Sequence, residues 1–250
     1  EAESHLAIRA GQRYAARLVH ARPRAATDTA TAVSGWRLAP TTRGSLDGFE
    51  RAPMQRRAPG PGEVEIEVQA VGLNFKDVLN VLGMYPGDPG PLGGECAGTI
   101  VAVGEGVEGL HAGDRVVALA SGAFRSHTTC EAAFVAPLPA SLSFADGAGL
   151  LIAHVTAEFA LRHLGRLQAG ERVLIHAAAG GVGLAAVALA QRVGAEVYAT
   201  AGSEAKRDHL RSLGVRHVYD SRSLTFAGQI MADTGAEGVD VVLNPPAGDF

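Results

Sequence analysis

The stretch from residue 175 to 191, IHAAAGGVGLAAVALAQ, restricts the fold of this chain more than any other. A short apolar run enters a glycine cluster, and an alanine-rich run of helical character follows at once. A strand, a glycine turn and a helix in this order let the backbone approach a pyrophosphate, which the helix N-terminus attracts. The stretch therefore predicts a dinucleotide-binding turn, with these residues at the cofactor: Gly180, Gly181, Val182 and Gly183.

The glycine spacing matches only part of the usual dinucleotide fingerprint, G-x-G-x-x-G. Gly180 and Gly183 fit its second and third glycines, whereas Ala178 stands in place of the first. A glycine cluster that serves only helix–sheet packing would look the same, so this alternative stays open. No Lys followed by Ser or Thr comes after the glycines, which excludes a P-loop.

Strands and helices alternate along the chain from about residue 143 onward. Strands are predicted at 172–177, 196–201, 217–220 and 239–244, with helices at 143–165, 183–194, 203–214 and 226–235. Alternation of this kind implies right-handed βαβ units and a parallel sheet. We expect a Rossmann-type, doubly wound sheet over residues 146–250, with C-terminal strands still to come.

Short strands and glycine turns dominate the part of the chain before it. The segment Glu63–Val68 alternates apolar and polar residues with period two, and residues 98–107 and 113–121 read in the same way. This pattern predicts a β-barrel-like domain over residues 36–145. Residues 1–35 are expected to hold one or two short strands and an Ala/Thr/Pro-rich linker.

The tip of the second parallel strand favours NADPH over NADH. An NAD site places Asp or Glu there, whereas a 2′-phosphate needs hydroxyl and cationic donors. This chain has Ser203 followed by Lys206 and Arg207, although Glu204 is close and the two cations would also suit a solvated helix face. We add Ser221 and Arg222, which follow the third strand, to the expected cofactor residues.

Charge and cysteine content limit the classes of function. The net charge of −4 and the pI of about 6.1 give no reason to expect binding to nucleic acid or to an anionic membrane. Cys96 and Cys130 are too few and too far apart for a disulfide framework, as in a cytoplasmic protein. The first residue is not methionine, and we expect a segment of a longer protein.

Several stretches together resemble the medium-chain dehydrogenase/reductase superfamily, and most closely the enoyl reductase domains of modular type I polyketide synthases. They are LNFKDVLNVLGMYPG, LGGECAGTIVAVGEGV, GDRVVAL, VLIHAAAGGVGLAAVALA, GSEAK and GVDVVLN. The resemblance covers roughly residues 36–250. It implies a GroES-like, substrate-binding domain followed by a Rossmann domain.

The resemblance also implies a reaction and its partners. NADPH would deliver a hydride to C3 of an α,β-unsaturated thioester, and C2 would then be protonated. The enoyl chain would arrive on the phosphopantetheine arm of an acyl carrier protein, next to neighbouring synthase domains. Zinc relatives place a His in a GHE motif, whereas this chain has Gly94 there, so we expect a zinc-free enzyme.

Three residues carry roles that only the resemblance implies. Tyr85 matches a catalytic tyrosine that is linked to protonation at a 2-methyl centre, with a 2S product. A tyrosine that merely packs in the turn beside Pro86 is the alternative. Asn74 matches a position beside the nicotinamide, and Thr156 matches a threonine that lines the cofactor cleft. The Lys and Asp proposed as proton donors in the family have no counterpart in these 250 residues.

Other conspicuous side chains are expected to be structural. Lys76 and Asp77 would form an ion pair or a helix cap, and His154 would be a satisfied core histidine. Glu158 would be costly if it were buried unpaired. Pro245 and Pro246 remove two backbone donors beside the expected nicotinamide pocket.

Two further functions stay open on the sequence. A free-standing NADPH quinone oxidoreductase shares the glycine signature and the lack of zinc ligands. A non-catalytic module of a megasynthase would keep the fold and bind NADPH weakly or not at all. By comparison with six-stranded doubly wound sheets, we expect the domain to need roughly 80 further residues.

Overall fold

A computed structural model describes residues 6–9, 12–15 and 35–244 of the chain, which form two compact units, residues 1–32 and 33–250. In the first unit, β1 (Leu6–Arg9) and β2 (Gln12–Ala15) are the short strands that the sequence predicts, and they pair in antiparallel fashion. Most of the predicted linker lies outside the described residues, and its last residue, Gly35, begins a strand.

The second unit begins with an antiparallel β part. Its five-stranded sheet has the order β8-β5-β6-β7-β9, and β3 pairs with β4 beside it. The strands are β3 (Gly35–Pro40), β4 (Phe49–Met54), β5 (Glu63–Val71), β6 (Glu95–Val103), β7 (Arg115–Leu119), β8 (His127–Glu131) and β9 (Val135–Pro137). A short helix, α1 (Phe75–Val81), follows β5, and a 3₁₀ turn, η1 (Ala132–Phe134), precedes β9.

The predicted period-two strand is confirmed in β5. Val64 and Ile66 are fully buried and pack in one cluster with Ile100 of β6. Glu65 lies on the opposite face, and it is nevertheless buried because both of its oxygens accept hydrogen bonds of 2.8 Å from Arg56. The two bonds offset the cost of removing a carboxylate from water.

Three helical segments lead from the β part to the parallel sheet, where the sequence predicts one long helix. They are α2 (Phe144–Ala148), α3 (Leu151–Glu158) and the π-helix η2 (Phe159–Leu164). Ser143 caps α2, since its hydroxyl accepts from the Asp146 N–H. None of the helices in the described part of the chain is both long enough and apolar enough to cross a membrane.

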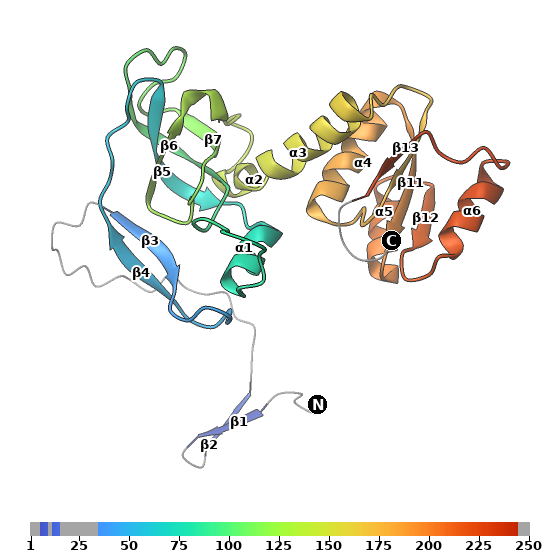
Figure 1. The fold of residues 1–250 in the computed structure, drawn as a ribbon, viewed down its shortest axis with the longest axis horizontal. Helices are drawn as coiled ribbons and strands as arrows, with labels where there is room; N and C mark the ends of the chain where they lie inside the picture. The colour runs from blue at the N-terminus through green and yellow to red at the C-terminus, as the bar shows by residue number, and fades with distance from the viewer. Residues whose placement is uncertain (1–5, 10–11, 16–34, 245–250) are drawn as a thin grey trace. The chain divides into compact units, whose positions relative to one another are not determined.

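The α/β part contains a four-stranded parallel sheet of order β12-β11-β10-β13 (Figure 1, orange to red). Its strands are β10 (Arg172–Ile175), β11 (Glu196–Ala201), β12 (His217–Asp220) and β13 (Val241–Leu243). The connecting helices are α4 (Gly181–Val193), α5 (Glu204–Ser212) and α6 (Thr225–Asp233). All four strands and three helices match the predicted segments within a few residues.

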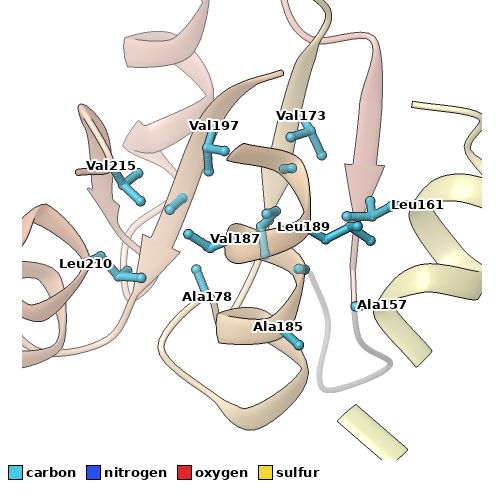
Figure 2. Packing of buried hydrophobic residues seen from close by; sticks show 14 of the residues in the cluster. Ala157, Leu161, Val173, Ala178, Ala185, Val187, Leu189, Val197, Leu210 and Val215 are labelled. Carbon is cyan, nitrogen blue, oxygen red and sulfur yellow. The ribbon is translucent and has the colours of Figure 1, made fainter. Parts of the chain in front are cut away.

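Strand periodicity determines which helix each strand residue meets. Val173 and Val197 join the cluster that α4 and α5 cover, whereas their chain neighbours Leu174 and Tyr198 pack with Ile230 of α6. Successive side chains point to opposite faces of a strand, so the sheet is covered on both faces. Figure 2 shows the first cluster, in which Leu189 of α4 lies near Leu161 of η2.

Candidate active site

The glycine turn between β10 and α4 forms the centre of the candidate site. Gly180 is the N-cap of α4 in extended conformation, and no side chain caps this helix. The backbone N–H groups of the first helical turn therefore have no partner inside the helix and carry its positive dipole end. Gly180 and Gly181 are exposed, so this end of the helix is accessible from solvent.

Gly181 and Gly183 have different steric roles in the turn. A Cβ atom at Gly183 would lie 2.5 Å from the Ala177 oxygen and 2.6 Å from the Ala178 Cα, whereas nothing lies within 4 Å of one at Gly181. Gly183 therefore allows the helix to pack against the strand end, and Gly181 keeps open the space before the helix. Such an open cradle of N–H donors fits the pyrophosphate of a dinucleotide.

The carboxyl ends of β11 and β12 bring together hydroxyl and cationic groups. A Cβ atom at Gly202 would lie 2.9 Å from Arg222 Nε and 3.4 Å from Ser221 Oγ. Ser203 and Lys206 follow at the start of α5, and both are exposed. Of the residues predicted for the cofactor, the structure thus places Ser221 and Arg222 directly beside Gly202.

Arg207 is used for structure. Its side chain is 15% exposed, and it donates to Glu204 and to the Ala201 carbonyl oxygen and lies 3.3 Å from Asp220. Arg211 also binds Glu204, and the hydrogen bonds from both arginines lower the pKa of that carboxyl. The negative charge of Glu204 is therefore balanced within the helix.

Asn74 and Asp77 lie at the junction of β5 and α1. Asp77 is buried and accepts from the backbone N–H groups of Asn74 and Gly93, at 3.0 and 2.7 Å, which confirms its predicted role as a helix cap. Asn74 donates from Nδ2 to Glu95 at 2.9 Å. The sequence analysis missed Glu95, although its position in the GGE stretch is a signal that could have found it.

Tyr85 follows α1 and is half-buried. The ammonium group of Lys76 lies over its ring, 5.5 Å from the ring centroid, an arrangement that attracts a cation to an aromatic face. Lys76 thus contacts Tyr85 and not Asp77 in the described structure. No contact among the described residues joins Tyr85 to the glycine turn.

Helix α3 carries His154 and Thr156, of which only His154 differs from expectation. His154 is exposed, with Nδ1 2.8 Å from the Leu150 oxygen, so the prediction of a core histidine is wrong. The buried residues nearby are Ala157 of α3 and Leu161 of η2, whereas His154, one turn before Ala157, is exposed. The predicted cofactor residue Thr156 is exposed as well.

Glu158 is also exposed. Its oxygens lie 4.0 Å from Arg162 and 3.9 Å from Arg192, and its side chain is 52% exposed. The cost of a buried unpaired carboxylate therefore does not arise. Pro245 and Pro246, expected beside the nicotinamide, lie outside the described residues.

The residues present do not fit a catalytic zinc ion. A Cβ atom at Gly94, where zinc relatives carry His, would lie 2.8 Å from Ile152 Cδ1. Burial raises the pKa of the Cys96 thiol to about 12. Within the described residues, no three His, Cys, Asp or Glu side chains are grouped to hold a metal.

Comparisons with known proteins identify the family of this chain. The model of the alcohol dehydrogenase GroES-like domain matches residues 60–140, and that of the zinc-binding dehydrogenase matches residues 181–249. The mycocerosic acid synthase-like polyketide synthase of Mycobacterium tuberculosis is 46% identical over 98% of this chain. A phenolphthiocerol/phthiocerol polyketide synthase protein of that organism is 43% identical over the same share. The chain spans 12% of the length of each.

The chain is also similar to solved structures of reductases. The CurK enoyl reductase is 46% identical with a TM-score of 0.81, and the match covers 86% of this chain and 68% of that one. The Escherichia coli quinone oxidoreductase complexed with NADPH is 32% identical with a TM-score of 0.77, over 86% of this chain and 67% of that one. The fold is that of a medium-chain dehydrogenase/reductase. Within that superfamily, the chain belongs to the enoyl reductase domains of polyketide synthases.

Proposed function

We propose that the chain reduces the α,β double bond of an enoyl thioester with NADPH as the hydride donor. The family membership supports an enoyl substrate, as in the CurK enoyl reductase. The observation that carries the cofactor assignment is the cluster of Ser221 and Arg222 at Gly202, next to an open glycine turn. When bound, the nicotinamide cofactor supplies the hydride.

The residues of this chain would bind and orient the cofactor. The first turn of α4, from Gly181 to Gly183, would hold the pyrophosphate with its backbone N–H groups. Hydroxyl groups and cations would hold the 2′-phosphate, since charge-assisted hydrogen bonds favour a doubly charged group over a ribose hydroxyl. These residues are Ser203, Lys206, Ser221 and Arg222. Asn74 and Thr156 would line the nicotinamide side.

Tyr85 is proposed to face the carbon that is protonated. Reduction at C3 leaves an enolate, whose oxygen needs stabilisation and whose C2 needs a proton on one face. Lys76 over the ring supports a fixed position of the tyrosine. Tyr85→Phe is expected to alter the C2 configuration or the protonation rate while NADPH affinity stays unchanged.

The substrate is proposed to arrive on an acyl carrier protein, within a synthase that holds neighbouring domains. The relatives named above are polyketide synthase proteins of which this chain spans 12%. We also propose that the β domain and the Rossmann domain meet near residue 145. The GroES-like match ends at residue 140, and α2 begins at Phe144.

The test follows NADPH consumption by the full-length protein with a 2-methyl-enoyl thioester, with NADH in parallel and determination of the C2 configuration. NADPH-dependent turnover with a 2S product supports the proposal. Turnover with a quinone but not with the enoyl thioester supports the alternative function, an NADPH quinone oxidoreductase. The solved Escherichia coli relative of that class is complexed with NADPH. Protein that is folded but does not bind NADPH would be the non-catalytic module.

A further inference from the structure

We propose that Glu95 determines which end of the Asn74 amide is presented to a ligand. This inference rests on the proposed function, in which Asn74 lies on the nicotinamide side. Glu95 is a positioning residue in this scheme: it forces Asn74 to act as a hydrogen-bond acceptor. Asn74 would then accept from the carboxamide of the cofactor, and it would be unable to donate to an enolate oxygen.

Each of the two carboxylate oxygens of Glu95 accepts a hydrogen bond from a different residue. Glu95 itself is 2% exposed. Oε1 accepts from Asn74 Nδ2 at 2.9 Å, and Oε2 accepts from the backbone N–H of Ile152 at 2.9 Å. The second donor belongs to the first turn of α3, so Glu95 is held in place by a rigid helix end.

The backbone at Gly72 lies close to the Glu95 side chain. A Cβ atom at Gly72 would lie 2.5 Å from Glu95 Oε1 and 2.6 Å from its Cγ. The backbone just after β5 therefore packs directly against the Glu95 side chain. The carboxylate is fixed from two sides, by the backbone at Gly72 and by the N–H of Ile152.

The Glu95 carboxylate determines the orientation of the Asn74 side-chain amide. A carboxylate offers only acceptors here, whereas an amide has a donor end and an acceptor end. The Nδ2 end of Asn74 must therefore face Glu95. The side-chain oxygen is therefore the end of the amide left for a ligand, since the Asp77 N–H donates to the Asn74 backbone oxygen at 2.9 Å.

Two variants separate this role from a purely structural one. In Glu95→Gln, the oxygen of Gln accepts from Ile152 and its NH₂ faces Asn74, so the Asn74 amide must turn over. We expect NADPH affinity to fall by about tenfold, as for one lost hydrogen bond to a ligand. Adding Asn74→Asp gives the Gln an acceptor again and restores an acceptor toward the ligand. We expect the double variant to regain most of the affinity.

Asn74→Asp alone is the matched control, because it places two carboxylates opposite each other and is expected to bind NADPH weakly. A double variant that binds no better than Glu95→Gln would overturn the proposal. Rescue would support it, because residue 74 of the double variant again presents an acceptor to the ligand.

A second readout needs no cofactor. In protein labelled with ¹⁵N-asparagine, the Asn74 side-chain NH₂ signal is identified by its loss in Asn74→Asp. We expect slow hydrogen exchange of this NH₂ in the wild type and faster exchange in Glu95→Gln. Rapid exchange in the wild type would overturn the inference. Protein that shows slow exchange but never binds NADPH would retain the Glu95–Asn74 contact and refute the proposed function.

Discussion

Gly183 packs against Ala177 so closely that a Cβ atom at Gly183 would lie 2.5 Å from the Ala177 carbonyl oxygen. The obstacle is backbone, and the start of α4 would have to move away from the strand end. We expect Gly183→Ala to lower the free energy of unfolding by about 1–3 kcal/mol, as for overpacking, and to abolish cofactor binding. Chemical denaturation and NADPH fluorescence titration measure the two effects.

Gly181→Ala is the matched control for that substitution. Nothing lies within 4 Å of its added Cβ, and alanine favours the helix by up to about 1 kcal/mol. We expect this variant to unfold no more easily than the wild type. It should nevertheless bind NADPH less well, because the methyl group fills the cradle. Equal destabilisation by both substitutions would contradict the different steric roles.

Ala177 has a positive φ of 49° in the turn before α4. A side chain in this left-handed region costs about 1–2 kcal/mol, and glycine removes that cost but loses more entropy on folding. We expect Ala177→Gly to raise the free energy of unfolding by up to about 1 kcal/mol. Ala178 is fully buried, and Ala178→Gly, measured in the same urea titrations, should be destabilising instead.

The cations at the β11 and β12 tips should divide into two kinds. Lys206→Ala and Arg222→Ala are each expected to weaken NADPH binding about tenfold and leave NADH binding unchanged, since each removes a charge-assisted hydrogen bond. Arg207→Ala should lower stability by about 1–2 kcal/mol and affect both cofactors alike, because its partners are Glu204, Asp220 and the Ala201 oxygen. Parallel titrations of each variant with NADPH and NADH give the ratio of the two dissociation constants. An Arg207→Ala variant that selectively lost NADPH would contradict this division.

Glu65 should make the stability of the β part depend on acid. The hydrogen bonds from Arg56 hold the pKa of this carboxyl below its usual value, and its side chain is 6% exposed. A lowered folded pKa gives stability that is complete above the unfolded pKa of about 4.3 and is lost as pH falls through the folded pKa. Glu65→Gln should flatten that acid limb in denaturation curves recorded from pH 6 to 3. Glu108→Gln, at an exposed position, should leave the curve unchanged.

The sequence predicted the elements whose pattern is local. The parallel strands and α4 to α6 follow from periodicity and glycine punctuation, and their faces follow from alternation along β10 and β11. Helix α1 was indicated only by the possible capping role of Asp77, because its seven residues offer too short a window for a helical period. The π-helix η2 was predicted as ordinary helix, since no pattern in FALRHL marks the change.

The candidate site was predictable where a motif carries it and not where distant residues meet. The glycine turn and the residues at the β11 tip were predictable because each consists of residues close together in the sequence. Glu95 and Ile152 are 57 residues apart, and their contact depends on how β6 and α3 pack. Arg207 looked equivalent to Lys206 until the fold placed Asp220 beside it. The exposure of His154, one turn from the buried Ala157, depends likewise on what packs against that end of α3.

The hydrogen bond from Ile152 to Glu95 also has a consequence for engineering chimeric reductases. The β part supplies the acceptor that begins a helix leading into the α/β part, so neither half ends cleanly between α2 and α3. A recombination breakpoint placed there would pair a helix start from one parent with a carboxylate from another. Hybrids should keep β6 through α3 as a single inherited block and exchange the chain after η2.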